Sequence, residues 1–148
     1  MKKILFVEDN GSYAKEVEKR LAVSIMDCDV TVAYTYLAAL GWWEECEGNF
    51  DCVILDLQVN PTGLDTSKYD EYAPLYGMAF LDEISMTLSE TDRQKLYQKI
   101  VISSGFVANL RDWLRIRQRR LDPIELIPKN SNNIDKLIAK VKKICAAN

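Results

Sequence analysis

Apolar positions along the chain follow two spacings, and the change from one to the other repeats five times. Runs that are apolar at almost every position, such as Lys3 to Val7 and Cys52 to Leu55, have the length and composition of buried β-strands. Between these runs, apolar residues recur at the spacing of an amphipathic helix, as Tyr13, Val17 and Leu21 do. Five strand and helix units in this order predict an α/β fold with three layers, in which helices cover both faces of a parallel sheet.

The predicted elements fill the chain without a linker, so residues 1–148 are expected to form one domain. The strands are expected at Lys3 to Val7, Val30 to Tyr34, Cys52 to Leu55, Ile100 to Ile102 and Ile124 to Ile127. The helices are expected to start near Ser12, to run from Tyr36 to Glu45, to start at Gly77, to include Val107 to Leu114, and to end the chain after a cap near Ser131. Leu37, Leu40 and Leu88 are expected to face the core, and Ser89-x-x-Asp92 predicts a capped short turn.

The bulk composition argues against several classes of protein. A net charge of -3 and a pI of about 5.1 do not favour a general binder of nucleic acids or membrane surfaces. A signal peptide is not expected, because Glu8 stops the first apolar run, and no apolar stretch approaches the roughly 20 residues of a membrane helix. The protein is therefore expected to be soluble and cytoplasmic. The four cysteines show no CxxC spacing and the chain has no histidine, so reduced buried thiols are expected rather than disulfides or a zinc site.

Polar residues that can carry chemistry stand where the predicted strands end. They are Glu8 and Asp9 after the first strand, Asp56 at the end of the third, Ser103 and Ser104 at the end of the fourth, and Lys129 after the fifth. Because the carboxyl ends of parallel strands meet at one edge of the sheet, we expect these side chains to converge. The polarity of loops alone explains the pattern less well, because carboxylates end two apolar strands on the same edge as a lysine.

Three carboxylates brought close together repel one another unless a cation lies between them. Mg2+ prefers oxygen ligands of this kind, whereas zinc or copper would be poorly served by a chain without histidine. With the negative charge screened, an aspartate oxygen can attack phosphorus and form an acyl phosphate. The ammonium of Lys129 and the hydroxyl of Ser104 are groups of the type that stabilises the remaining phosphoryl oxygens.

Four segments at these strand ends resemble those of one family, the response regulator receivers of two-component signalling. They are Lys3-Ile4-Leu5-Phe6-Val7-Glu8-Asp9-Asn10, Phe50-Asp51-Cys52-Val53-Ile54-Leu55-Asp56-Leu57, Ile102-Ser103-Ser104-Gly105 and Ile127-Pro128-Lys129. Each segment is weak evidence alone, but the four occur in the family's order, and the resemblance covers nearly the whole chain. It implies a flavodoxin-like receiver fold with strand order 2-1-3-4-5.

The resemblance also implies a set of functional residues. Asp56 would accept the phosphoryl group, Glu8, Asp9, Asp56 and the carbonyl of Gln58 would bind Mg2+, and Ser104 and Lys129 would hold the phosphoryl oxygens. Ser104 is preferred to Ser103 because a small residue and an aromatic follow it, as they often follow the family's hydroxyl. The implied partners are a histidine kinase or phosphotransfer protein and a downstream protein target, the latter at the face of the fourth and fifth predicted helices. Direct contact with nucleic acid or membrane is not expected.

The chain departs from the family in the loop after the phosphoacceptor and in the fifth strand. The segment from Leu57 to Tyr76 is unusually long, and it suggests a lid over the acceptor, a partner contact or a mobile surface segment. Leu126 stands where the family often has an aromatic that changes rotamer on phosphorylation, and Asn130 stands where a proline commonly follows the lysine. These changes put an aromatic relay in doubt, even where phosphorylation occurs.

A basic run marks the fourth predicted helix, with Arg111, Arg115, Arg117, Arg119 and Arg120. It is interpreted either as a solvated face with local salt bridges or as a docking surface for an acidic partner. Trp113 within this run is either an interface anchor or a residue at the rim of the core.

The favoured function is a stand-alone receiver that is not an enzyme and that signals through protein binding, because no DNA-binding or catalytic domain follows the last helix. The alternative is a receiver-like interaction domain that works without phosphorylation. A small phosphohydrolase with an aspartate nucleophile is disfavoured, because Gln58 stands where haloacid-dehalogenase-like phosphatases carry a second carboxylate. A flavodoxin-like cofactor carrier is disfavoured because the acidic loop after the first strand would repel a phosphate.

Overall fold

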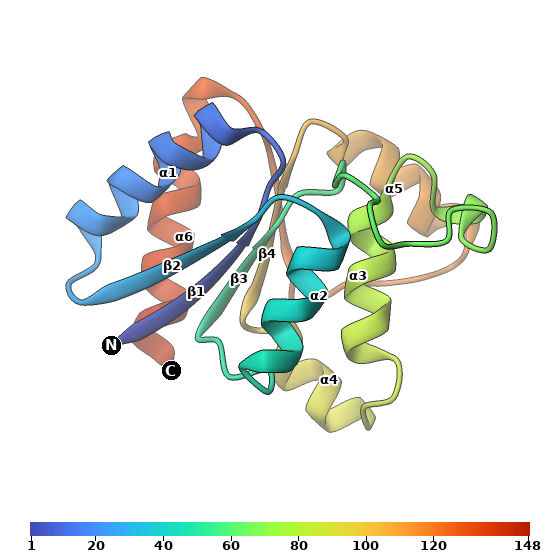
Figure 1. Ribbon diagram of the computed structural model, residues 1–148, viewed down its shortest axis with the longest axis horizontal. Helices are drawn as coiled ribbons and strands as arrows, with labels where there is room; N and C mark the ends of the chain where they lie inside the picture. The colour runs from blue at the N-terminus through green and yellow to red at the C-terminus, as the bar shows by residue number, and fades with distance from the viewer.

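The computed structural model describes residues 1–148, apart from the side chain of Ser131. The strands β1 (Lys2–Val7), β2 (Cys28–Ala33), β3 (Cys52–Leu55), β4 (Ile100–Ser104) and β5 (Glu125–Pro128) form one sheet. Their spatial order is β2-β1-β3-β4-β5, and every neighbouring pair is parallel (Figure 1). The predicted α/β fold and its strand order are therefore confirmed.

Helices lie on both faces of the sheet (Figure 1). On one face lie α1 (Gly11–Ser24) and α6 (Ile134–Ala147), and on the other lie α2 (Tyr36–Glu45), α3 (Tyr76–Ser85) and α5 (Val107–Ile116), with α4 (Glu90–Tyr97) between α3 and β4 in the chain. Two short 3-10 helices, η1 (Asp70–Tyr72) and η2 (Ser131–Asn133), precede α3 and α6. The three predicted layers are thus helices, sheet and helices.

The central strands are apolar on both sides because each side faces a separate hydrophobic cluster. In β1, Ile4 and Phe6 pack toward α1 and α6, while Leu5 and Val7 pack toward the opposite layer. All four of these side chains are buried, as are all residues of β3. Successive side chains on a strand point to opposite faces, so a strand that is covered on both faces has no exposed face for polar residues. The first polar positions appear where the strands end.

The region after α3 differs from its prediction. The capped short turn is a helix, α4, in which the hydroxyl of Ser89 accepts a hydrogen bond from the backbone N of Asp92 at 3.2 Å. This bond confirms the cap, although the helix continues to Tyr97. The prediction that Leu88 faces the core was wrong, because α3 ends at Ser85 and Leu88 lies half-buried in the connection.

Two smaller predictions need correction. Leu37 was expected in the core but is 57% exposed on α2, whereas Leu40 is partly buried against the core. Strand β5 begins and ends one residue later than predicted, at Glu125 and Pro128. The expected cap near Ser131 depends on a side chain that lies outside the described part of the chain.

The long segment 57–76 packs against the helices beside it. Tyr72 is buried and its hydroxyl donates to Asp82 Oδ2 on α3 at 2.7 Å. The indole Nε1 of Trp113 on α5 donates to the backbone O of Glu71 at 3.0 Å. In Figure 1 the segment runs past the start of α3 and along α5. Of the three alternatives for this segment, these contacts argue against a mobile surface segment.

The arginine run is not confined to a helix. Because α5 ends at Ile116, Arg117, Arg119 and Arg120 lie beyond it, and the prediction that the helix carries all five arginines was wrong. The Arg117 guanidinium lies 4.1 Å from the centroid of the Trp113 ring. Trp113 itself is buried in the hydrophobic cluster, which favours the interpretation as a core residue.

The two chain ends lie side by side at the edge where the strands begin (Figure 1). Lys2 Nζ donates to the backbone O of Asn148, and the side-chain amide of Asn148 donates to the backbone O of Asp51 at 3.2 Å. Among the described residues, no helix combines the length and the apolar composition needed to cross a membrane.

Candidate functional site at the carboxyl edge of the sheet

Backbone hydrogen bonds continue past the strand ends and fix the first polar residues. The backbone N of Glu8 donates to Ala33 O at 2.9 Å, and that of Asp56 donates to Val7 O at 3.0 Å. On the other side, the backbone N of Lys129 donates to Ser104 O at 2.8 Å. The site residues therefore inherit their positions from the register of the sheet, as the sequence predicted.

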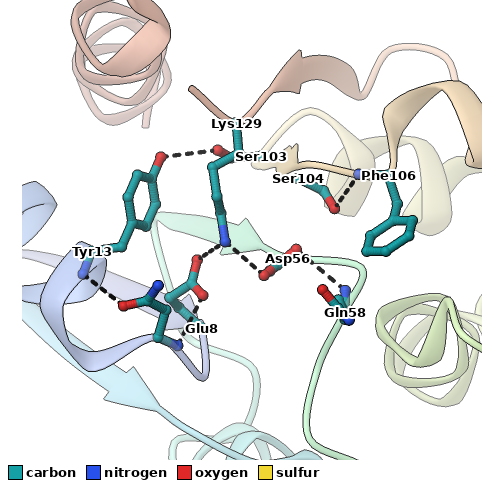
Figure 2. A network of polar contacts seen from close by, with 9 residues as sticks. Glu8, Tyr13, Asp56, Gln58, Ser103, Ser104, Phe106 and Lys129 are labelled. Atoms are coloured by element: carbon teal, nitrogen blue, oxygen red, sulfur yellow. Dashed lines mark hydrogen bonds and ion pairs between the residues drawn. The ribbon is translucent and has the colours of Figure 1, made fainter. Parts of the chain in front are cut away.

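Lys129 joins two buried carboxylates at this edge (Figure 2). Its Nζ lies 2.7 Å from Glu8 Oε1 and donates to Asp56 Oδ2 at 2.8 Å. Glu8 is fully buried and Asp56 is 3% exposed, while the Lys129 side chain is 21% exposed. One ammonium between two carboxylates leaves excess negative charge in a place that water reaches poorly.

The pKa values show the strain of this arrangement. Burial raises the pKa of Glu8 from 4.5 to about 7, and the charge of Asp56 adds to the rise, while Lys129 and the backbone N of Asn10 oppose it. Burial lowers the pKa of Lys129, but its contacts with Asp56 and Glu8 outweigh that effect and raise it above its ordinary value. The charged form of Glu8 is thus disfavoured.

One oxygen of Glu8 is incompletely satisfied. Glu8 Oε2 accepts a hydrogen bond from the backbone N of Asn10 at 3.1 Å. Glu8 Oε1 has the ammonium of Lys129 at 2.7 Å and no further hydrogen-bond donor among the residues that the structure describes. A buried carboxylate oxygen with a single cationic partner can also accept a metal cation as a ligand.

Three carboxylates gather at this point. Oxygens of Glu8, Asp9 and Asp56 lie within 4.8 Å of one another, and Asp9 is exposed while the other two are buried. A set of oxygen donors fits a hard divalent cation such as Mg2+. Gln58, the remaining predicted metal ligand, lies next to Asp56, since its backbone N donates to Asp56 Oδ1 at 3.2 Å.

The start of α3 packs closely against the backbone of Asp56. The backbone N of Gly77 donates to Leu57 O at 2.8 Å. A Cβ atom at position 77 would lie 2.3 Å from the backbone O of Asp56, closer than any side chain allows. Glycine is therefore required there, and α3 holds the backbone of Asp56 in place.

The two serines at the end of β4 have different partners. The hydroxyl of Ser104 is buried and accepts a hydrogen bond from the backbone N of Phe106 at 3.1 Å. The hydroxyl of Ser103 lies 3.3 Å from that of Tyr13 on α1. Ser103 is thus engaged with a helix on the other side of the sheet, and its neighbour Ser104 turns toward the loop that follows β4.

Tyr13 belongs to the site although the sequence pattern placed it among the core residues of its helix. Its ring centroid lies 4.7 Å from Lys129 Nζ, so the ammonium faces the aromatic surface (Figure 2). Asn10, which directly follows the acidic pair, caps α1 and accepts a hydrogen bond from the backbone N of Tyr13. The one sequence signal for Tyr13 is its place three residues after this cap.

Comparison with protein-family models and with curated proteins found no match. Solved structures do match over nearly the whole chain. The non-phosphorylated receiver domain of HemR from Leptospira biflexa has a TM-score of 0.66 and 21% identity, with 99% of this chain and 95% of that chain covered.

Two further structures come from other response regulators. The phosphorylated cyanobacterial phytochrome response regulator RcpA has a TM-score of 0.60 and 25% identity over 97% of this chain and 90% of that one. The response regulator TrrA from Thermotoga maritima, in complex with Mg(2+)-BeF, has a TM-score of 0.61 and 23% identity over 97% of this chain and 99% of that one. Together with the sheet order, these matches identify the fold: the chain has the fold of response regulator receiver domains.

Proposed function

We propose that the protein is a receiver that accepts a phosphoryl group on Asp56 in a reaction that depends on Mg2+, and that it signals through protein binding. The observation that carries this proposal is the pairing of the buried Asp56 carboxylate with Lys129 beside two further carboxylates. A structural ion pair needs one carboxylate for one ammonium. The excess of carboxylates here suits a cation and a transferred phosphoryl group.

In the proposed reaction, a carboxylate oxygen of Asp56 forms a bond to phosphorus, and the bond between phosphorus and the donor's nitrogen breaks. Lys129 would exchange its hydrogen bond with Asp56 Oδ2 for one with a phosphoryl oxygen. The Ser104 hydroxyl accepts a hydrogen bond from the backbone N of Phe106, so its own proton can be donated to another phosphoryl oxygen. Glu8, Asp9, Asp56 and the carbonyl of Gln58 would hold Mg2+. When bound, Mg2+ offsets the charge of the carboxylates and of the phosphoryl group.

The proposed partners follow from this chemistry. A histidine kinase or a phosphotransfer protein would supply the phosphoryl group, and a cytoplasmic protein target would bind the face formed by α5, β5 and α6. The proposed role is therefore not enzymatic turnover of a substrate, although slow transfer from small donors and slow hydrolysis of the acyl phosphate are expected.

Leu126 of β5 favours a second candidate function, which is partner binding without phosphorylation. Leu126 is half-buried and pairs with Ile102 of β4, so an aliphatic side chain stands where a relay would need an aromatic one. In this alternative the fold binds its partner without phosphorylation, and the segment 57–76 and α5 form the binding surface.

Intact mass after incubation with Mg2+ and phosphoramidate tests the proposal. We expect the wild-type protein to gain the mass of one phosphoryl group, and hydroxylamine to remove it, as it does for an acyl phosphate. Asp56→Asn should gain nothing. Asp29→Asn, which changes an exposed carboxylate on β2, should behave as the wild type does.

Two results would contradict the proposal. A wild-type protein that gains no mass with phosphoramidate or acetyl phosphate is not a phosphoacceptor, and the binding function without phosphorylation is then favoured. A gain that persists in Asp56→Asn, or that resists hydroxylamine, would place the modification elsewhere.

A further inference from the structure

Tyr13 is held in one position by contacts on four sides. Its backbone N is bound by the side chain of Asn10 at 3.1 Å, in the cap of α1. Its ring meets the ring of Phe6 edge-on at a centroid distance of 6.4 Å. Its hydroxyl lies 3.3 Å from Ser103 Oγ, and its face lies 4.7 Å from Lys129 Nζ. The contacts with Asn10, Phe6 and Ser103 therefore hold the ring in place independently of Lys129.

The contact with Lys129 uses the part of the ammonium that the carboxylates leave open. Two directions of the ammonium point at Glu8 and Asp56, and the ring face covers a third side. An aromatic face attracts a cation, and the attraction grows as water is excluded. Burial raises the pKa of Tyr13, and its contacts with Ser103 and Lys129 oppose that rise, so the hydroxyl remains a neutral hydrogen-bonding group.

We propose that Tyr13 is a positioning residue for Lys129, which it holds between Glu8 and Asp56, and that Ser103 fixes the Tyr13 ring for this task. The inference rests on the proposed function, because it concerns the lysine that would meet the phosphoryl group. A lysine side chain has several rotatable bonds and a strongly hydrated charge, so its ammonium is not fixed by the backbone alone. The ring limits the positions of Nζ and keeps water from its open side.

The geometry also gives Ser103 and Ser104 separate tasks. Ser103 supports the ring that holds Lys129, while Ser104 is the hydroxyl on the side of Phe106. Both residues belong to the end of β4, so one strand end sets the position of the lysine and of the second phosphoryl contact. This division explains why two serines in succession are useful where one hydroxyl would suffice for the phosphoryl group.

The test compares Tyr13→Phe with Tyr13→Leu in the full chain. Phenylalanine keeps the ring and loses the contact with Ser103, whereas leucine removes the ring. The first readout is the NMR shift of the Lys129 ε-methylene protons, recorded without phosphodonor. We expect an upfield ring-current shift in the wild type, a similar or reduced shift in Tyr13→Phe, and its loss in Tyr13→Leu.

The second readout is the initial rate of mass gain from phosphoramidate with Mg2+. We expect the rate to fall by about threefold to tenfold in Tyr13→Leu, the range that a partly desolvated cation–π contact supports, and by about twofold or less in Tyr13→Phe. Ser103→Ala should resemble Tyr13→Phe. Tyr34→Leu, at an exposed tyrosine near the start of α1, is the matched control and should leave both readouts unchanged.

The outcomes separate the inference from the proposed function. Wild-type ε-methylene protons without an upfield shift, or a folded Tyr13→Leu variant that reacts at the wild-type rate, would overturn the role of Tyr13. A wild-type protein that takes up no phosphoryl group would contradict the proposed function, while the NMR comparison would still decide whether the ring holds Lys129. Circular dichroism of each variant establishes that it is folded, and rescue by phenylalanine distinguishes positioning from mere packing.

Discussion

Two clusters in this protein bury a carboxylate beside a cation, and they differ in charge balance. In the first, which we call the clamp, Asp82 receives hydrogen bonds from Tyr72 at 2.7 Å and from two nitrogens of Arg119 at 2.9 and 2.8 Å. One carboxylate therefore meets one guanidinium, and both carboxylate oxygens are bound. At the carboxyl edge of the sheet, one ammonium, that of Lys129, meets both Glu8 and Asp56.

The pKa values follow this difference. In the clamp, the hydrogen bond that Arg119 donates to Asp82 raises the pKa of Arg119 above its ordinary value, and burial together with Asp82 raises the pKa of Tyr72. Both groups thus keep their protonated, hydrogen-bonding forms. At the carboxyl edge of the sheet, burial and the charge of Asp56 raise the pKa of Glu8 to about 7, so its charged form is disfavoured. A balanced cluster leaves each buried charge with a partner, so removing one partner is costly, whereas an unbalanced cluster leaves capacity for a cation or a phosphoryl group.

The clamp also explains how the long segment 57–76 stays attached. Tyr72 belongs to that segment, Asp82 to α3 and Arg119 to the connection after α5, so three separate parts of the chain meet at one carboxylate. Trp113 supports the same junction through its bond to Glu71. These polar contacts add to the apolar packing of the segment, in which Leu57, Val59 and Leu75 are buried in the hydrophobic cluster.

The largest effect is expected from Asp82→Ala. Removing this carboxylate leaves Arg119, whose side chain is only 32% exposed, without its ion-pair partner. Breaking a buried pair typically costs 3 to 5 kcal/mol, and the partial exposure of Arg119 reduces the expected loss to about 3 kcal/mol. Urea unfolding measures the loss.

Asp112→Ala is the matched control, since it breaks an ion pair with Arg115 in which both side chains are at least 70% exposed. Its effect should stay within about 0.5 kcal/mol. Equal effects of the two substitutions would show that the clamp does not stabilise the fold.

A smaller effect on the free energy of unfolding is expected when the pH changes the charge of Glu8 at the carboxyl edge of the sheet. The folded pKa of Glu8, about 7, lies above its ordinary value of 4.5, so the stability that protonated Glu8 contributes is present below pH 4.5 and is lost as the pH rises through 7. The free energy of unfolding, measured in EDTA, should fall by about 2 kcal/mol between pH 5 and pH 8. The chain has no histidine to titrate in that range.

Glu8→Gln tests the assignment of this pH dependence, because an amide cannot ionise. Its stability should change little between pH 5 and pH 8, and at pH 8 it should exceed that of the wild type. Added Mg2+ should reduce the pH dependence of the wild type, because a cation favours charged Glu8. A wild-type protein whose stability is flat or rising over this range would show that Glu8 is not strained.

The smallest effect is expected from Tyr72→Phe, which removes one of the hydrogen bonds to Asp82 and keeps the ring. Asp82 would retain both bonds from Arg119, so the loss should be about 1 to 1.5 kcal/mol in urea unfolding. Hydrogen exchange should also rise within residues 57–76. Unchanged stability and unchanged exchange in this segment would mean that packing of the ring, and not the hydroxyl, attaches it.

The sheet and the gathering of Glu8, Asp56 and Lys129 at its carboxyl edge were predictable because both depend on local pattern. Apolar runs that stop at Asp56 or before Glu8 mark strand ends, and parallel strands bring their ends together. The clamp was not predictable, since Tyr72 and Arg119 reach Asp82 from 10 and 37 positions away and have no periodic signature. Leu37 was misplaced because periodicity identifies a helix face without showing what covers it. Tyr13 was assigned to the core because a ring over a lysine follows the same spacing as a ring in a core.

The adjacency of the two chain ends has a practical consequence for engineering. Lys2 and Asn148 are in contact at the edge where the strands begin, and Asp56 and Lys129 lie at the edge where they end. A fluorescent reporter or an affinity tag fused to either end would therefore stand clear of the candidate site. A short peptide joining the two ends would close the chain into a ring that leaves every strand end undisturbed, which makes this scaffold suited to circular permutation.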